Sequence, residues 1–250
     1  MSQRVSRILW PSLCLIAMIA VLEGLTRSEW IPPYLFPKPS EILGLLSPSQ
    51  PDLWPAALET LESALLGLSL SLAVGGLLCL ISDQMRTLKD LLLPLSTFFQ
   101  TVPIIAIAPL LVIYFGFGQP TAVASAFFVS IFPIIASGLL GLEKSPPELL
   151  ELFRLWEASS YQQLFHLRLP FAYPYFRAGL RIAIGLAIIG AIAGEFVGGG
   201  GLGALIDSAR TQQRLDLVYA CLLVMSLMAL ALLMLLSLAH RAIQAWRPLP

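Results

Sequence analysis

The chain has 250 residues, of which 57% are hydrophobic and only 12% are charged, whereas an ordinary soluble domain carries roughly 25% charged residues. Its 15 basic and 15 acidic residues balance, so the composition argues against a general nucleic-acid-binding protein. Residues 8–22, 63–82, 91–142 and 217–239 contain no Asp, Glu, Lys or Arg, and a membrane-spanning helix needs about 20 mostly apolar residues. These features exclude a soluble enzyme and predict an all-α polytopic membrane protein, with a single transmembrane domain over residues 1–250.

The apolar runs and the breakers between them predict about six transmembrane helices, at 8–25, 58–82, 91–115, 121–142, 176–197 and 217–239. The first run follows basic residues, as in a signal peptide, but it lacks a small-x-small cleavage site, so we predict an uncleaved span. Pro103, Pro109 and Pro133 interrupt the longest apolar window and predict kinks there.

The placement of Lys and Arg predicts the orientation, because the cytoplasmic loops of membrane proteins are enriched in these residues. With a cytoplasmic N-terminus, 11 of the 15 basic residues fall inside and 4 fall outside, namely Arg27, Lys38, Arg210 and Arg214. We therefore expect both termini in the cytoplasm. The connections are then an external linker at 26–57, an external turn at 116–120, a cytoplasmic segment at 143–175 and a glycine-rich external re-entry at 198–216. In the linker, Ser40 after Pro39 is predicted to cap a short helix.

Small residues recur every four positions in two of the spans, a spacing that lets helices approach closely in lipid. They form three stripes: Ser63, Gly67, Ser71 and Gly75; Ala183, Ala187 and Ala191; and Gly190 and Gly194. The stripes predict a compact helix bundle.

The cytoplasmic segment 143–175 contains an amphipathic helix that starts at Pro146 and Pro147. Its apolar residues Leu149, Leu152, Phe153 and Trp156 follow at i, i+3, i+4 and i+7, which is one face of a helix. Two serines at 159–160 end this pattern before a second apolar stripe. Such a helix lies on the membrane or in a groove of a partner protein, and its mixed rather than Lys-rich polar face favours the protein partner.

The same segment resembles the cytoplasmic signature of the inner-membrane permeases of ABC-type importers: Glu-Ala-Ala, three residues, Gly, nine residues, then Ile-x-Leu-Pro. The spacing fits from Glu151 to Pro170. Leu152 and Phe153 replace the two alanines, and Glu157 replaces the glycine. A glycine at this position would let the chain turn between two short helices. Glu157 lacks that conformational freedom, so the geometry of the turn is open to change in this chain.

Three further stretches, YLFPKPSEI, TVPIIAIAPLLVIYFGFG and GEFVGGGGLGALI, resemble the nitrate/sulfonate/taurine branch of these permeases, which includes transporters for thiamine precursors and riboflavin. The resemblance covers about residues 30–245. It implies the permease subunit of an ATP-driven importer in the bacterial inner membrane. The implied partners are a second permease copy, an ATPase under each copy and an extracytoplasmic substrate-binding protein. It also implies an ATPase-coupling surface made of Glu151, Leu152, Phe153, Trp156, Glu157, Ala158, Leu167, Leu169 and Pro170.

The sequence offers no catalytic or cofactor site of its own. No GxxxxGK[ST] loop is present, so we expect a partner chain to hydrolyse ATP and this chain to be no enzyme. Gly198, Gly200 and Gly203 fit G-x-G-x-x-G, but an apolar span precedes them instead of a strand, which favours close packing over nucleotide binding. His166 and His240 are far apart and the three cysteines are isolated, so we expect no metal site and no disulfide.

Two sets of residues are candidates inside the membrane. Glu195, near the external end of the fifth span, either serves at an external gate or solute entrance or is a structural acceptor that holds the glycine-rich re-entry. Phe99, Gln100 and Thr101, with the neighbouring Phe98, are candidates for lining the translocation path. The spans carry almost no fixed charge, so the cargo stays open between nitrate-, sulfonate- or taurine-like solutes and vitamin precursors.

Two other function classes remain as alternatives. A self-sufficient secondary carrier or channel would show buried charge pairs or inverted repeats. A membrane-embedded enzyme would show His, Asp, Glu or Cys clustered at one membrane level. Neither pattern is clear in the sequence, which favours the permease.

Overall fold

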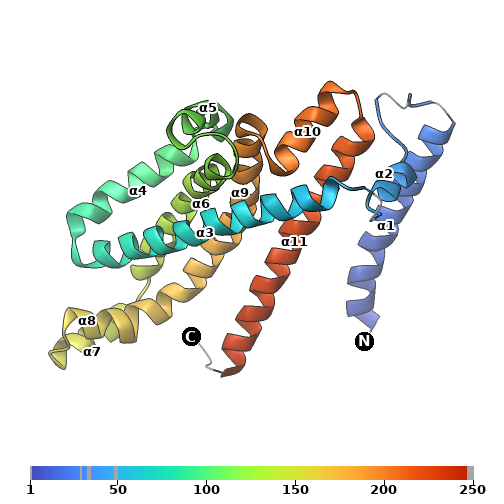
Figure 1. Ribbon diagram of the computed structural model, residues 1–250. Coiled ribbons are helices and arrows are strands. Elements are labelled where there is room, and N and C mark those ends of the chain that lie inside the picture. Colours follow the sequence, from blue (N-terminus) through green and yellow to red (C-terminus); the bar gives the residue numbers. More distant parts are fainter. Residues whose placement is uncertain (1, 29, 33–34, 48–49, 247–250) are drawn as a thin grey trace.

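The computed structural model describes the backbone of residues 2–28, 30–32, 35–47 and 50–246, and within these ranges the side chains other than those of 2–9, 11–12, 15, 86, 243 and 245–246. All regular secondary structure in these ranges is helical (Figure 1). The helices are α1 (Ser2–Arg27), α2 (Pro39–Leu45), α3 (Leu53–Gln84), α4 (Arg86–Gln100), α5 (Ile104–Phe115), α6 (Gln119–Leu142), α7 (Pro147–Leu155), α8 (Ser160–Gln163), the π-helix η1 (Leu164–Arg168), α9 (Leu169–Gly198), α10 (Gly201–Thr211) and α11 (Leu215–Trp246). The predicted all-α fold is confirmed.

Four stretches of continuous helix are long and apolar enough to cross a membrane: Leu53–Gln84, Gln119–Leu142, Ser160–Gly198 and Leu215–Ala242. They correspond to the second, fourth, fifth and sixth predicted spans. The first predicted span, 8–25, falls in α1. Several of its side chains lie outside the described residues, so its membrane crossing stays a prediction.

The third predicted span is not the continuous helix that we expected over 91–115. It is divided into α4 and α5, which are bent 104° relative to each other, so the pair is either a broken span or a re-entrant loop. The break lies at Pro103, whose backbone is extended with φ −65° and ψ 119°. Proline has no N–H to continue the helix, and it disfavours helical geometry at the residue before it. Pro109 and Pro133 lie inside α5 and α6 without ending them.

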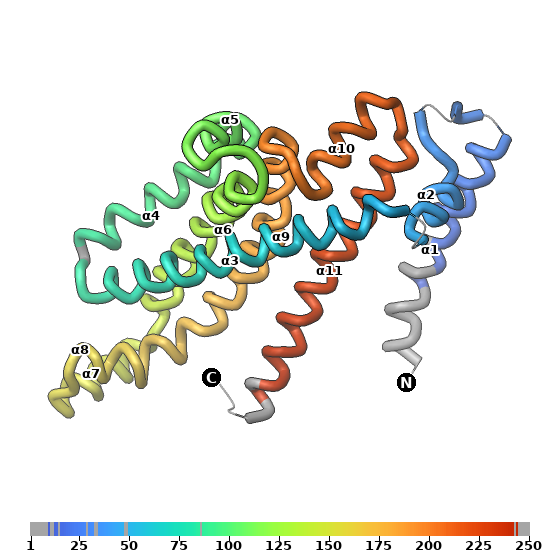
Figure 2. Tube along the Cα trace, in the orientation of Figure 1, coloured from blue at the N-terminus to red at the C-terminus, as the bar shows by residue number. Residues whose placement is uncertain are grey.

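The fifth span also differs from the prediction, because its helix begins before residue 176. α8, η1 and α9 form one helical stretch from Ser160 to Gly198, and the trace passes through it without interruption (Figure 2). The second half of the predicted cytoplasmic segment is therefore helical and continuous with α9, in a stretch that is long and apolar enough to span a membrane. A movement of the segment can be transmitted directly into α9.

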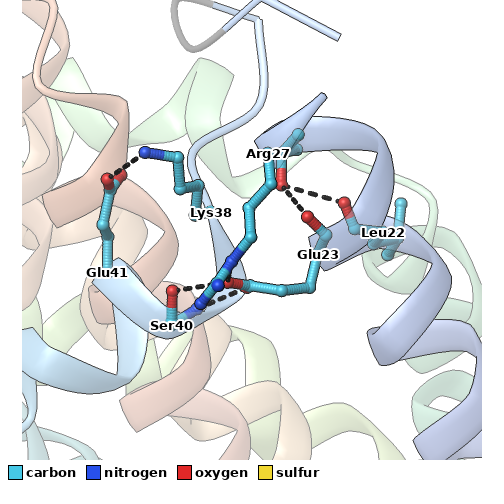
Figure 3. Close-up of polar contacts among 7 residues, drawn as sticks. Leu22, Glu23, Arg27, Lys38, Ser40 and Glu41 are labelled. Atoms are coloured by element: carbon cyan, nitrogen blue, oxygen red, sulfur yellow. Dashed lines mark hydrogen bonds and ion pairs between the residues drawn. The ribbon is translucent and has the colours of Figure 1, made fainter. Parts of the chain in front are cut away.

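The short helix of the linker is α2, and Ser40 is its second residue instead of its cap. The Ser40 backbone N–H and hydroxyl donate to the two carboxylate oxygens of Glu23 in α1, at 2.9 and 2.7 Å (Figure 3). Glu23 also accepts from Arg27 Nε at 2.7 Å. The Glu23 carboxylate of α1 thus accepts a hydrogen bond from an unpaired N–H group at the start of α2. From the sequence alone we expected the Ser40 side chain to do this.

The centre of the bundle is α6, which packs against α3 on one side and α9 on the other. Glycines allow the close approach of α3 and α9 to α6. A Cβ added at Gly67 would lie 2.8 Å from Val123 O, and one added at Gly190 would lie 2.8 Å from Ala126 Cα. Ser71 Oγ in α3 lies 2.7 Å from Ser130 Oγ in α6. All residues of the three predicted stripes are buried, which confirms their role in helix packing.

The ends of the helices separate into two sides of the molecule (Figure 1). The α7–α8 region and the free ends of α1 and α11 lie on the lower side of the view. α5, α10 and the C-terminal end of α1 lie on the upper side. The predicted external turn at 116–120 and the glycine-rich re-entry at 198–216 thus lie opposite the segment predicted to be cytoplasmic.

Candidate functional site

The segment with the family-like signature forms a helical hairpin whose turn is built by Glu157. The N–H of Glu157 donates to Arg154 O, and the N–H of Ala158 donates to Phe153 O, both at 3.0 Å. Glu157 itself has φ +52°, in the left-handed region. This pair of bonds with one left-handed residue is a Schellman motif, in which glycine is the usual occupant.

The second arm of the hairpin starts at a capping box. Ser159 Oγ accepts from the Gln162 N–H at 3.3 Å, and Gln162 Oε1 accepts from the Ser159 N–H at 2.8 Å. Two serines that were predicted to end one helix therefore begin the next. Since both sides of the turn are fixed by backbone-directed bonds, the hairpin has a defined shape even with glutamate at its left-handed position.

Replacing Glu157 with Gly is expected to raise the free energy of unfolding by about 1 kcal/mol, because a left-handed non-glycine residue is strained by about 1–3 kcal/mol. Thermal unfolding of the solubilised protein measures this. The matched control is Glu151→Gly, an exposed position inside α7, where glycine is expected to cost about 1 kcal/mol. Equal effects of the two substitutions would contradict the turn geometry.

We call residues 151–161 the tip, and large apolar side chains cover it. Leu155 is 81% exposed, Trp156 is 70% exposed and Tyr161 is 68% exposed. Phe153 packs beside Trp156 with ring centroids 6.2 Å apart. Exposed apolar groups of this size on an otherwise polar segment indicate a surface for another protein or for lipid.

The base of the hairpin is held in the body of the protein. Leu164 and Leu167 are buried in a cluster with residues of α3, α4, α6 and α9. Arg168 forms an ion pair with Asp83 at the end of α3, and Lys89 in α4 forms one with Glu143 after α6. A pocket of about 570 Å³ lies beside both pairs. The tip is thus carried on a base that is continuous with α9 and packs against α3, α4 and α6.

The structure divides the predicted coupling residues into two groups. Those exposed or half-buried on the tip are Glu151, Leu152, Phe153, Trp156, Glu157 and Ala158. The other three, Leu167, Leu169 and Pro170, lie at the base, and Leu167 is only 2% exposed. Sequence reasoning missed Leu155 and Tyr161. The i, i+3 spacing of Leu155 from Leu152 could have indicated the former. No local pattern indicates the Asp83–Arg168 pair, whose members are 85 positions apart.

A second polar site lies at the opposite end of the bundle, where three side chains hold the start of α10. We call Glu59, Thr60 and Glu195 the α10 clamp. The N–H groups of three consecutive residues of α10 each donate to one member: Gly201 to Glu59 Oε2 at 2.9 Å, Leu202 to Thr60 Oγ1 at 2.8 Å, and Gly203 to Glu195 Oε2 at 3.0 Å. These N–H groups have no partner within the helix, and a helix N-terminus favours negative charge.

Glu195 is the buried carboxylate of the α10 clamp, with 1% of its surface exposed. The Thr60 hydroxyl lies 2.8 Å from Glu195 Oε2 and can donate to it. Oε1 has no hydrogen-bond partner among the described residues. A Cβ added at Gly203 would lie 2.6 Å from Glu195 Cβ, so the glycine makes room for this side chain. These contacts agree with the reading of Glu195 as a structural acceptor, while a role at an external gate or solute entrance stays a prediction.

The candidates for the translocation path lie at the bend between α4 and α5. Phe99, Gln100 and Thr101 are exposed. The Phe99 ring stacks on Phe132 of α6 with centroids 5.0 Å apart, and the Thr101 hydroxyl donates to Phe98 O at 2.7 Å. Among the described residues, these contacts do not include Glu195, so the role of the three candidates in the path stays a prediction.

Comparison with known proteins decides the family. Residues 67–247 match the sequence model described as "Binding-protein-dependent transport system inner membrane component". The chain belongs to this family. The predicted resemblance is confirmed, and the chain is an ABC transporter permease for a small solute.

Relatives of this permease match it over nearly its whole length. A probable ABC transporter permease of Haemophilus influenzae is 34% identical over 227 residues, which are 90% of this chain and 93% of that protein. The riboflavin transport permease RibX of Chloroflexus aurantiacus is 32% identical over 245 residues, 95% of this chain and 91% of that protein. The taurine transport permease TauC of Escherichia coli is 26% identical over 93% of this chain and 87% of that protein.

The fold of this permease also has a counterpart among solved structures. An inward-facing structure of the MetNI methionine ABC transporter matches 81% of this chain and 97% of that chain, with a TM-score of 0.57 and 20% identity. At this identity the match supports the fold of the permease alone.

Proposed function

We propose that this permease is the membrane subunit of an ATP-driven importer and that the tip of its α7–α8 hairpin is the contact with a separate ATPase chain. In this proposal the ATPase hydrolyses ATP, and an extracytoplasmic binding protein delivers the solute. A second copy of the permease completes the path. The single observation that carries the coupling role is the exposed apolar tip on a hairpin whose base is continuous with α9.

The shape of the hairpin supports transmission of force from a partner. Schellman and capping-box bonds fix the tip, and buried leucines and two ion pairs fix the base. A partner that grips Leu155 and Trp156 would therefore move α9 instead of bending the hairpin alone. Within the sequence, the absence of a GxxxxGK[ST] loop is in agreement with ATP hydrolysis by another chain.

The proposed location is the cytoplasmic membrane of a bacterial-type cell, with both termini in the cytoplasm. The excess of Lys and Arg in the segments grouped with the hairpin supports this orientation. So does the common side of the α7–α8 region and the free ends of α1 and α11 (Figure 1).

The proposed cargo is a small heteroaromatic compound of the vitamin or vitamin-precursor type. Two relatives whose names state such a cargo, for riboflavin and for formylaminopyrimidine, are each 32% identical to this permease over 95% and 88% of its chain. Relatives named for nitrate and aliphatic sulfonates are 27% identical over 69% and 79% of it. Loss of labelled riboflavin or formylaminopyrimidine uptake in cells that lack the permease tests this class, and loss of nitrate or taurine uptake alone would contradict it.

The coupling role is tested with a photo-crosslinking amino acid at Leu155, the most exposed large apolar side chain of the tip. In native membranes we expect it to label a soluble chain with a GxxxxGK[ST] loop. The matched control carries the crosslinker at Trp30, which is 83% exposed in the predicted external linker and is expected not to label that chain. Labelling of lipid alone from Leu155 would contradict the proposal and would indicate that the tip lies on the membrane.

A further inference from the structure

A basic pocket lies between α9 and α11, on the side of the molecule that also carries the hairpin. Its volume is about 330 Å³, which is the space of roughly ten waters at about 30 Å³ each. Arg177 and Arg181 of α9 and His240 and Arg241 of α11 line it. Four cationic or titratable side chains from two helices thus converge on one concave site.

The three arginines of this pocket have no counter-charge within the part of the chain that the structure describes. Arg177, Arg181 and Arg241 form no ion pair there, whereas Arg27, Arg168, Arg210 and Arg214 each do. The acidic residues of the two helices, Glu195 and Asp216, lie at their opposite ends. The pocket is therefore a region of unbalanced positive charge.

The position of these arginines makes the imbalance costly in the absence of a ligand. Arg177, Arg181 and Arg241 belong to stretches that are long and apolar enough to span a membrane. Cationic side chains in such helices are rare and pair with an opposite charge or reach the headgroup layer. A single arginine in such a helix can extend its side chain to the headgroup layer by itself. That explanation does not account for three arginines from two helices that line the same pocket.

The rest of the pocket wall suits a lipid. Leu233 and Leu236 of α11 line it beside the arginines, and α11 continues with Leu230, Met234 and Leu238 exposed. The His240 ring is held on the polar side by Tyr173, whose hydroxyl lies 3.1 Å from Nδ1. A polar, cationic cavity therefore adjoins an apolar helix surface.

We propose that this pocket binds the phosphate headgroup of an anionic phospholipid, whose acyl chains lie along the exposed apolar side chains of α11. Guanidinium groups bind phosphate oxygens through paired, charge-assisted hydrogen bonds. Basic pockets between membrane helices favour anionic headgroups for this reason. The lipid belongs to the cytoplasmic leaflet, a detail that rests on the orientation proposed above, while the lipid class rests on the pocket alone.

The test compares spin-labelled phosphatidylglycerol with spin-labelled phosphatidylcholine at the surface of the full-length permease, in vesicles that hold both lipids. The wild type is expected to prefer phosphatidylglycerol by at least about tenfold. A variant with Arg177→Gln, Arg181→Gln and Arg241→Gln is expected to keep less than about twofold preference, since each arginine near the surface contributes about fivefold. The matched control is Arg210→Gln with Arg214→Gln, two paired arginines at the other end of the molecule, and it should retain the wild-type preference.

Three results would overturn the proposal. The first is an unchanged preference for phosphatidylglycerol in the triple variant. If that variant does not fold, the three single variants are measured instead. Each is expected to lose about fivefold of the preference, and an unchanged preference in all three would overturn the proposal. The second is displacement of the labelled lipid by millimolar inorganic phosphate, which would indicate a site for a soluble anion. The third is loss of a co-purifying ATPase from the triple variant with the lipid preference intact, which would assign the arginines to a protein contact. Failure of the crosslinking test at Leu155 would leave the lipid result unaffected, so the two proposals fail separately.

Discussion

Replacing Glu195 with Ala is expected to lower the free energy of unfolding of the permease by about 2–4 kcal/mol. The substitution removes the acceptor of the Gly203 N–H and of the Thr60 hydroxyl in a site that is 1% exposed. A buried donor without a partner costs about 1–3 kcal/mol, and the space left by the side chain adds to this. The Thr60 hydroxyl can still donate to Ala56 O at 3.1 Å. Only the Gly203 N–H therefore loses its acceptor completely, and the penalty for an unpaired buried donor applies once instead of twice.

The matched control for this prediction is Glu195→Gln, which keeps one acceptor oxygen and almost the same shape. It is expected to unfold within about 1 kcal/mol of the wild type, because an amide costs less to bury than a charged carboxylate. Unfolding of the purified protein in detergent, followed by circular dichroism, measures both variants. If Glu195→Ala had the same free energy of unfolding as the wild type and lost only transport, the structural role of Glu195 would be wrong. That result would support its role at an external gate or solute entrance.

Replacing Gly194 with Val is expected to prevent α9 from packing on α6. A Cβ at this position would lie 2.7 Å from Ala122 Cα and 2.9 Å from Thr121 O, and both are backbone atoms that cannot rotate away. Overpacking costs about 1–3 kcal/mol even where neighbouring side chains can adjust, and here the two helices must separate. We expect the yield of folded protein to fall at least about fivefold, as measured by size-exclusion chromatography after solubilisation.

The matched control for Gly194 lies on the same helix. A Cβ added at Gly185 meets no heavy atom within 4 Å, so Gly185→Val is expected to give a yield close to that of the wild type. Equal losses from the two substitutions would mean that valine itself, and not the contact with α6, disturbs α9.

The sequence predicts the spans because span length and apolarity depend on local composition. The second, fourth and sixth spans are found near their predicted positions for this reason, and the fifth lies within a longer helical stretch that begins at Ser160. The bend between α4 and α5 was missed because a proline inside an apolar run is compatible with a kinked helix or with a break. Pro109 stays inside α5, whereas Pro103 lies at the break and directly precedes α5, so the residue type alone does not separate the two outcomes.

The candidate sites were predictable to different degrees. The hairpin follows from spacing and from the two serines, and its turn occurs at the position where the family signature has glycine. The contacts of Glu195 could not be derived, since Thr60 lies 135 positions away. The same holds for the basic pocket, because Arg177 and Arg241 meet only when α9 and α11 are placed side by side.

The central claim, that the tip joins this permease to a separate ATPase, is tested most directly by co-purification of a tagged permease from mildly solubilised native membranes. The wild type is expected to retain a soluble ATPase with a GxxxxGK[ST] loop in stoichiometric amount, and Trp156→Asp is expected to lose it by at least about thirtyfold, the effect of a buried aromatic anchor worth about 2 kcal/mol or more. Trp30→Asp makes the same change at another exposed tryptophan, in the predicted external linker, and it should retain the ATPase. Equal recovery of the ATPase with Trp156→Asp, or recovery of the wild-type permease alone and still active in liposomes without ATP, would contradict the account.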